Sequence, residues 1–157
     1  MPEPNTELIC VIPARGGSKG IPRKNLAEVG GKPLVAWSIE AALRSRGITR
    51  VVVSTDDPEI ADVSREYGAE VPCLRPAHLA GDQAGPGEAI THIMNYLRCE
   101  EGYDPQANVI FFPTHLFRPA SMVDELCEKL FQGFRAVRTV KPVHVDRGRF
   151  FIPAEAS

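Results

Sequence analysis

Residues 14–25 bring glycines and cationic side chains together in one short segment, and this segment has the clearest chemical potential in the sequence. Four cations lie within ten residues, interleaved with three glycines: Arg15, Lys19, Arg23, Lys24, and Gly16, Gly17, Gly20. Glycines let backbone N–H groups approach an anion closely, and cations neutralise its charge. The segment therefore suits a triphosphate. A solvated basic turn is the alternative, but a loop of this length in a compact domain is more often functional.

The segment differs from both common glycine motifs that bind nucleotides. A Walker A loop ends in Gly-Lys followed by Ser or Thr, whereas Gly31-Lys32 is followed by Pro33. The GxGxxG pattern of dinucleotide-binding folds does not occur either. We therefore expect a phosphate loop of another type.

Acidic, histidine and cysteine residues give no clear metal site. Asp56 and Asp57 are adjacent carboxylates, which suit Mg²⁺, but the Pro58-Glu59 that follows them favours helix capping over metal binding. The histidines lack the spacing of a metal trio, and the cysteines form no CxxC pair. The residues alone therefore predict no protein metal ligands, and they predict that the cysteines are small buried hydrophobes.

Alternating apolar runs predict the elements that would hold the glycine-rich loop. Strands are predicted at 8–13, 48–55, 71–74, 109–112, 136–140 and 149–152. Helices are predicted at 34–46, 58–67, 88–97 and 122–131, and Gly47 is expected to end the first of them. We expect Pro33 at the first helical position and Asp56 or Asp57 as an N-cap.

This order of elements predicts one α/β domain over residues 1–157, with a Rossmann-like, mostly parallel sheet and helices on both faces. The loops at 14–25, 75–87 and 113–119 each follow a predicted strand. Sheets of this type bind ligands at the carboxyl ends of their strands, so these loops should meet at one site.

Composition excludes several classes of function. A net charge of −2 and a pI near 6.1 argue against a nucleic-acid partner. The apolar runs are too short to cross a membrane, and the acidic residues 1–7 do not resemble a signal peptide. We therefore expect a cytoplasmic protein.

Residues 12–25, IPARGGSKGIPRKN, resemble the first signature of the acylneuraminate cytidylyltransferases, the CMP-sialic acid synthetases. Relatives that activate legionaminic or pseudaminic acid share this signature. Further blocks continue the resemblance in order: GKPL at 31–34, VSTDD at 53–57, YGAEVP at 67–72 and LRPAHLAGD at 74–82. The resemblance implies a fold of the nucleotide-diphospho-sugar transferase type.

The family transfers CMP from CTP to a nine-carbon keto-acid sugar and releases pyrophosphate, so the resemblance implies this reaction with Mg²⁺ as cofactor. It also leaves a homodimer as an expected assembly. Arg15 and Lys24 would hold the phosphates and act in catalysis, and Asn25 and Arg75 match positions that contact the cytidine. The nucleotide-binding set that it implies is Arg15, Gly16, Gly17, Ser18, Lys19, Lys24, Asn25, Arg75 and Asp82. Two roles are equally compatible with Asp82: it orients its loop, or it is an ordinary aspartate in a turn.

The sugar side departs from the family pattern. This chain reads FPTHLFR at 112–118, where family members usually read QPTSPLR, so Phe112 replaces a glutamine that would touch the sugar. Thr114 and Arg118 are kept and His115 is new, and these three form the predicted sugar-binding set. Pro86 stands where a serine would meet the ribose. His115 is either a base near neutrality or a local hydrogen-bonding residue.

Family members are typically longer than this chain, which stops at Ser157. The remainder normally carries the metal-binding aspartates and the segment exchanged between subunits. The sequence is therefore interpreted as a fragment, a split enzyme or a shortened homologue. Besides a cytidylyltransferase, it is compatible with a nucleotide-binding module without turnover, or with a nucleotidyltransferase acting on another sugar acid or base.

Overall fold

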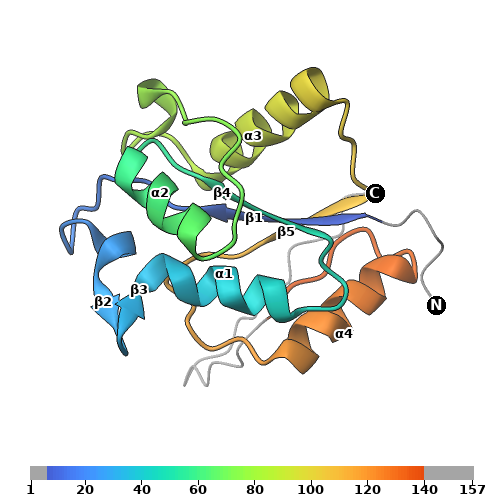
Figure 1. Cartoon of the computed structure of the whole chain (residues 1–157). Helices are drawn as coiled ribbons and strands as arrows, with labels where there is room; N and C mark the ends of the chain where they lie inside the picture. Colours follow the sequence, from blue (N-terminus) through green and yellow to red (C-terminus); the bar gives the residue numbers. More distant parts are fainter. Residues whose placement is uncertain (1–6, 140–157) are drawn as a thin grey trace, which may run out of the picture.

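The computed structural model describes residues 7–139 and has a parallel sheet at its centre (Figure 1). Its strands are β1 (Leu8–Pro13), β4 (Arg50–Ser54) and β5 (Ala107–Ile110), in the order β4-β1-β5. Both pairs of neighbours are parallel, with Val11 opposite Val52 on one side and Ile110 on the other. The predicted parallel α/β sheet is confirmed.

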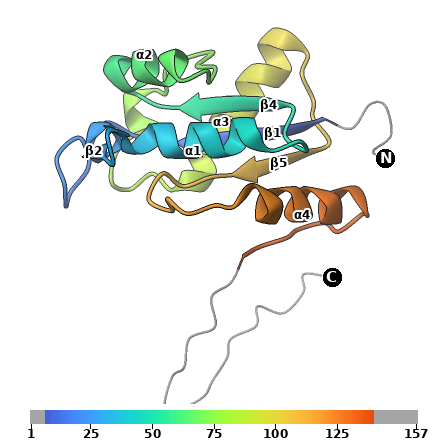
Figure 2. The same ribbon diagram turned by 60° about the horizontal axis from the view of Figure 1, so that its bottom comes forward.

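Helices cover both faces of this sheet, as predicted (Figure 2). One layer holds α1 (Leu34–Arg44), α2 (Pro58–Glu66) and α4 (Ala120–Phe131), and α3 (Pro86–Glu101) lies on the opposite face. The side chains of β1 alternate between the layers, because successive residues of a strand point to opposite faces. Leu8, Cys10 and Ile12 belong to the first core, and Ile9 and Val11 to the second.

Short elements shape the loops at the carboxyl ends of the strands. The 3-10 turn η1 (Lys24–Leu26) follows the glycine-rich loop, and η2 (Ala77–Leu79) lies in the second loop. A hairpin of β2 (Glu28–Val29) and β3 (Lys32–Pro33) comes between η1 and α1. Gly30 and Gly31 form its turn with φ of +59° and +85°, a conformation that glycine adopts without steric cost.

Several predicted boundaries are wrong for identifiable reasons. Residues 71–74 form no strand, because Pro72 has no N–H to continue a ladder, and only an isolated bridge joins Val52 to Glu70. The first helix ends at Arg44 rather than at Gly47, and Pro33 precedes it as the N-cap. Residues 136–139 are not a strand, and 140 and 149–152 lie outside the described residues.

Two further expectations concern the membrane and the cysteines. Of the helices within residues 7–139, none is long and apolar enough to cross a bilayer. Cys10 and Cys127 are buried as predicted, but Cys99 on α3 is exposed, which corrects that prediction.

Candidate nucleotide-binding site

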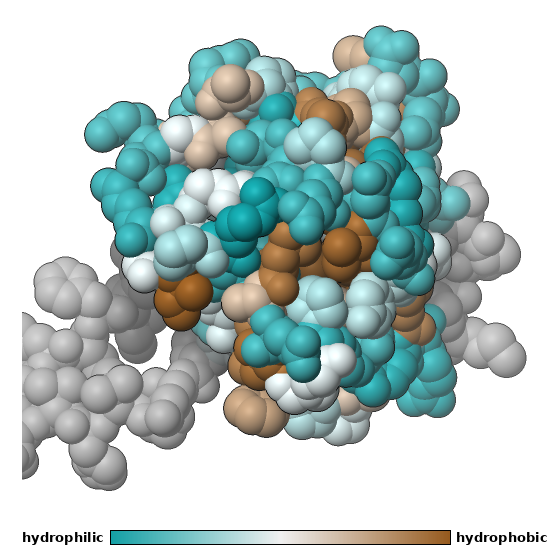
Figure 3. Space-filling view, turned by 60° about the vertical axis from the view of Figure 1, so that its left-hand side comes forward, coloured by the Kyte–Doolittle hydropathy of each residue, from teal (hydrophilic) through white to brown (hydrophobic). Residues whose placement is uncertain are grey.

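The loops that follow the strands meet around a pocket at the carboxyl edge of the sheet. Its volume is about 300 Å³, and it is lined by residues from three segments: Pro13 and Arg15; Arg75, Asp82, Ala84, Gly85 and Pro86; and Phe112. Figure 3 views the molecule from this side and shows a mostly hydrophilic surface with apolar patches near its centre. The loops at 14–25 and 75–87 meet at the pocket as predicted, whereas the loop at 113–119 adds only the residue before it, Phe112.

Arg15 and Lys19 place two positive charges beside Asp82. The Asp82 carboxylate accepts a hydrogen bond from Arg15 Nη1 at 3.1 Å and lies 3.3 Å from Lys19 Nζ. The hydrogen bond from Lys19, and then that from Arg15, hold the pKa of Asp82 below its ordinary value. One carboxylate thus sits between two cations, where a phosphate group would be attracted for the same reason.

The base of the glycine-rich loop is held by hydrogen bonds to its own ends and to the loop after β4. Asn25 is 5% exposed, and its Nδ2 donates to the carbonyl oxygen of Arg15 at 2.9 Å. The N–H of Gly16 donates to Asp56 Oδ1, also at 2.9 Å. Because the Gly16 amide already has a partner, Gly17 and Ser18 are the better candidates for the predicted phosphate cradle.

Asp57 acts as the N-cap of α2, one of the two aspartates that the sequence offered for this role. Its Oδ1 accepts from the N–H groups of Glu59 at 2.8 Å and Ile60 at 3.2 Å. Its Oδ2 lies 3.1 Å from Arg23 Nη2. A Cβ on Gly16 would lie 2.8 Å from that Oδ2, so this position has room only for glycine. The close approach of the loop to Asp57 explains why residue 16 is a glycine.

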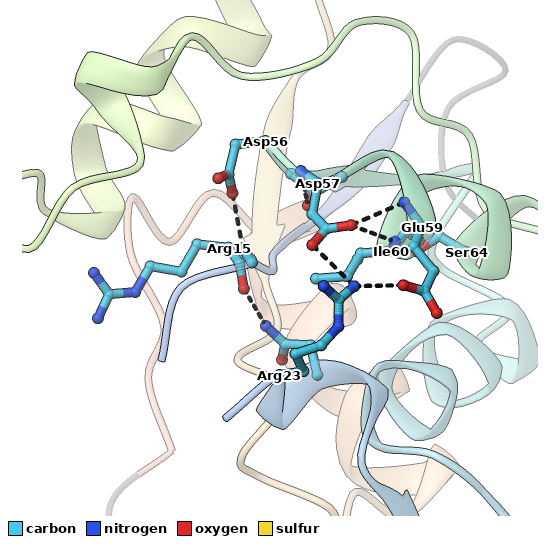
Figure 4. A network of polar contacts seen from close by, with 10 residues as sticks. Arg15, Arg23, Asp56, Asp57, Glu59, Ile60 and Ser64 are labelled. Carbon is cyan, nitrogen blue, oxygen red and sulfur yellow. Dashed lines mark hydrogen bonds and ion pairs between the residues drawn. The ribbon is translucent and has the colours of Figure 1, made fainter. Parts of the chain in front are cut away.

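Arg23 points away from the predicted phosphate site. Figure 4 shows its guanidinium between Asp57 and Glu59, whereas the Arg15 side chain extends in another direction. Lys24 is half-buried at the start of η1, and within residues 7–139 no carboxylate lies at ion-pair distance from it. Of the four cations in the loop, three could therefore bind a phosphate group: Lys24 directly, and Arg15 and Lys19 beside Asp82.

The carboxylates near the loop do not fit a ready-made magnesium site. Asp56 and Asp57 hold backbone amides, and Asp82 pairs with two cations. No group of three His, Cys, Asp or Glu in the described part of the chain is arranged to hold a metal ion.

Arg75 forms the buried back of the pocket and is only 7% exposed. Its Nη2 donates to the carbonyl oxygen of Ser54 at 2.6 Å, and its Nε donates to Ser54 Oγ at 3.2 Å. Nη1 makes a longer contact of 3.4 Å with the carbonyl oxygen of Leu79. Burial lowers the pKa of Arg75. The loop is thereby fixed to the end of β4, and Nη1 is the donor most available to a ligand.

The turn after β5 differs from the sugar site that the resemblance implies. Thr114 and His115 are exposed, and Phe112 rather than either of them lines the pocket. The Phe112 and His115 rings meet edge to face with centroids 6.1 Å apart.

Arg118 supports this turn from behind. It donates to the carbonyl oxygen of Phe112 and to Ser38 Oγ on α1, and it lies over the Phe111 ring. Burial lowers the pKa of its guanidinium. These contacts hold the turn in place. Arg118 could therefore contact a sugar, as predicted, only after breaking its hydrogen bonds to the turn and to α1.

Comparison with known proteins identifies the family. The family model described as "Cytidylyltransferase" matches residues 9–96. The chain belongs to the cytidylyltransferase family. The matched residues include the glycine-rich loop, the segment that contains Asp56 and Asp57, and the loop that carries Arg75 and Asp82. All five blocks that carry the resemblance lie wholly within the matched residues.

Three curated relatives match between 59 and 88% of this chain. The pseudaminic acid cytidylyltransferase of Campylobacter jejuni is 46% identical over 92 residues, which are 59% of this chain and 40% of that protein. The N-acylneuraminate cytidylyltransferase of Escherichia coli O18:K1:H7 is 36% identical over 88% of this chain and 31% of its own length. The CMP-N,N'-diacetyllegionaminic acid synthase of Legionella pneumophila is 36% identical over 87% and 58%. The chain thus spans between 31 and 58% of these relatives.

Solved structures confirm the Rossmann-like fold of this family. A CMP:2-keto-3-deoxy-manno-octonic acid synthetase in complex with CTP aligns with a TM-score of 0.68 at 22% identity, over 81% of this chain and 48% of that one. A 4-diphosphocytidyl-2C-methyl-D-erythritol synthase aligns with a TM-score of 0.62 at 18% identity, over 81% and 55%. At these identities the likeness concerns the fold.

Proposed function

We propose that this chain forms the CTP-binding part of an enzyme that transfers CMP from CTP to a sialic-acid-like keto-acid sugar and releases pyrophosphate. The observation that carries the proposal is the glycine-rich loop beside the pocket. Its Arg15 and Lys19 both pair with the Asp82 carboxylate, and the buried Arg75 lines the same pocket. Membership of the cytidylyltransferase family supports the same reaction.

In this reaction the anomeric hydroxyl oxygen of the sugar attacks the α-phosphorus of CTP. A new P–O bond forms, the bond from the α-phosphorus to the bridging oxygen breaks, the hydroxyl proton is lost, and pyrophosphate leaves. Negative charge grows on the departing group, so preorganised cations lower the barrier. Arg15 and Lys24 are the residues that we assign to this role, with Lys19 assisting.

The resemblance also makes Mg²⁺ part of the proposal. Asp56, Asp57 and Asp82 do not fit it as ligands, because each already binds a backbone amide or a cation. The ion would enter with the triphosphate, and no step is assigned through these residues. The nucleotide base is assigned to Arg75, whose Nη1 can donate to the O2 or N3 acceptors of cytosine. Asn25 reaches the nucleotide only if it releases the Arg15 carbonyl.

One observation favours an acceptor other than neuraminic acid itself. Phe112 replaces the family glutamine and presents a 37% exposed aromatic surface to the pocket. An aromatic wall cannot hydrogen-bond a sugar hydroxyl, but it packs well against a deoxy carbon or an acyl methyl group. An acceptor that carries more such groups than an acylneuraminate is therefore the second candidate.

The test is to incubate the full chain with CTP, Mg²⁺ and a panel of keto-acid sugars, and to measure pyrophosphate together with the CMP-sugar. We expect release with one or a few sugars, and none from the Lys24→Ala variant. Arg98→Ala serves as the control, because Arg98 forms an exposed ion pair with Asp104 far from the pocket. CTP binding without release from any sugar would instead support a nucleotide-binding module. The proposed homodimer and cytoplasmic location are tested separately, by light scattering and by cell fractionation.

A further inference from the structure

Arg23 has a backbone conformation that its residue type rarely adopts. Its φ of +51° is the only positive φ of a non-glycine residue within residues 7–139. Side chains disfavour this left-handed region because Cβ crowds the following carbonyl group. Such outliers persist where the surroundings fix them, and they cluster at functional sites.

The surroundings of Arg23 fix both its side chain and its backbone. Its Nη2 lies 2.7 Å from Glu59 Oε2 and 3.1 Å from Asp57 Oδ2, both at the start of α2. Its carbonyl oxygen accepts the N–H groups of Leu26 at 2.9 Å and Ala27 at 3.2 Å. The side chain thus anchors the loop to α2 while the backbone turns into η1.

This turn decides where the next two residues go. Lys24 is the first residue of η1, and Asn25 follows it into the buried contact with the Arg15 carbonyl. The other end of the loop reaches the same part of the molecule, since Gly16 donates to Asp56 and packs against Asp57. Both ends of the loop are therefore attached to the residue pair Asp56-Asp57 (Figure 4).

We infer that Arg23 is a positioning residue for the phosphate loop: through Asp57 it holds the loop in the conformation that presents Arg15 and Lys24 to the triphosphate. The inference rests on the proposed function for the identity of the ligand. Arg23 is 51% exposed, and exposed ion pairs contribute little to global stability. A role in loop geometry therefore accounts for the strained backbone better than a role in folding.

The test compares Arg23→Gly, Asp57→Asn and the double variant with wild type. Glycine tolerates the positive φ, so Arg23→Gly removes the side chain without adding strain. Asparagine still caps α2 but loses the charge that pairs with Arg23. Arg23→Lys is the conservative variant, and Arg98→Ala is the matched control, since it also removes an exposed arginine from an ion pair.

In the free protein, we expect hydrogen exchange at the Gly16 amide to be at least about tenfold faster in Arg23→Gly and Asp57→Asn. With CTP, calorimetry should show about tenfold weaker binding for each, consistent with displaced contacts. The double variant should be no weaker than either single variant, because both act through one ion pair. Arg23→Lys should recover part of the affinity, and the melting temperatures should match that of Arg98→Ala.

Unchanged exchange in Arg23→Gly, or additive losses of affinity in the double variant, would overturn this inference. A fall in melting temperature that explains the loss of affinity would also overturn it, since Arg23 would then act on folding. If wild type does not bind CTP, the proposed function fails, and the exchange measurement on the free protein still decides whether Arg23 holds the loop.

Discussion

The two loops that follow the neighbouring strands β1 and β5 are built in different ways. Residues 14–25 are attached at both ends to the Asp56-Asp57 pair, and Arg15 from this loop lines the pocket. Residues 112–118 present an aromatic side chain to the pocket and keep their guanidinium, that of Arg118, for internal support. Under the proposed function, the charged loop would bind the triphosphate and the more apolar wall would contact the acceptor sugar.

The sharpest test of this comparison is Gly16→Val. A Cβ here would lie 2.8 Å from Asp57 Oδ2 and 2.9 Å from Asp57 Cβ, so the loop would have to move away from α2. We expect a loss of about 3 kcal/mol or more in CTP binding free energy, at the upper end for overpacking. Calorimetry measures the loss, and Gly20→Val is the control, because no atom lies within 4 Å of a Cβ at Gly20. Equal effects at both positions would contradict the close approach.

Arg15→Ala should have the next largest effect. The variant removes a charged donor at the mouth of the pocket, and losing such a contact costs about 1–3 kcal/mol of binding free energy. Titration of CTP into the variant and into Arg98→Ala measures this. An affinity equal to that of wild type would mean that the triphosphate lies elsewhere.

Asp82→Asn is expected to change affinity in the opposite direction. Asp82 carries a negative charge between Arg15 and Lys19, where the triphosphate is proposed to bind. Neutralising it should tighten CTP binding by less than about tenfold, because exposed charge pairs are weak. The gain should shrink as salt is added. Weaker binding in this variant would instead give Asp82 the orienting role that the sequence left open.

Phe112→Gln should have the smallest effect on CTP and the clearest effect on the acceptor. Restoring the family residue leaves the charged loop untouched, so CTP affinity should stay within about twofold, as for changes that leave a ligand's contacts intact. The ratio of kcat/KM values between a fully hydroxylated and a deoxy, acylated keto acid should shift toward the hydroxylated sugar. An unchanged ratio would remove Phe112 from the acceptor site.

The sequence predicted the parallel sheet, its two covered faces and the convergence of the loops at 14–25 and 75–87, because these follow from local apolar periodicity and from the topology of parallel strands. It also favoured helix capping by Asp56 or Asp57 over metal binding, and Asp57 is the cap. It placed a strand at 71–74 because apolar character there outweighed the missing N–H of Pro72.

Contacts between residues that lie far apart in the sequence could not be predicted from local patterns. Arg23 looked equivalent to the other loop cations, and only its left-handed backbone and its distance to Asp57 separate it from them. Arg118 matched a family position, yet its hydrogen bonds to Ser38 and Phe112 depend on where α1 lies relative to the turn after β5. Such partners lie far apart in the sequence, and no local pattern records them.

The most direct test of the account is a thermal shift of the full chain with CTP, UTP and ATP, each with and without Mg²⁺. A ligand that binds only the folded state stabilises it by about 2.7 kcal/mol at a hundred times its Kd. The account predicts a clear rise in Tm with CTP, a smaller one with UTP or ATP, and little from Mg²⁺ beyond its effect on the triphosphate. No shift with CTP, or the same shift with every nucleotide, would contradict the claim that these residues recognise cytidine.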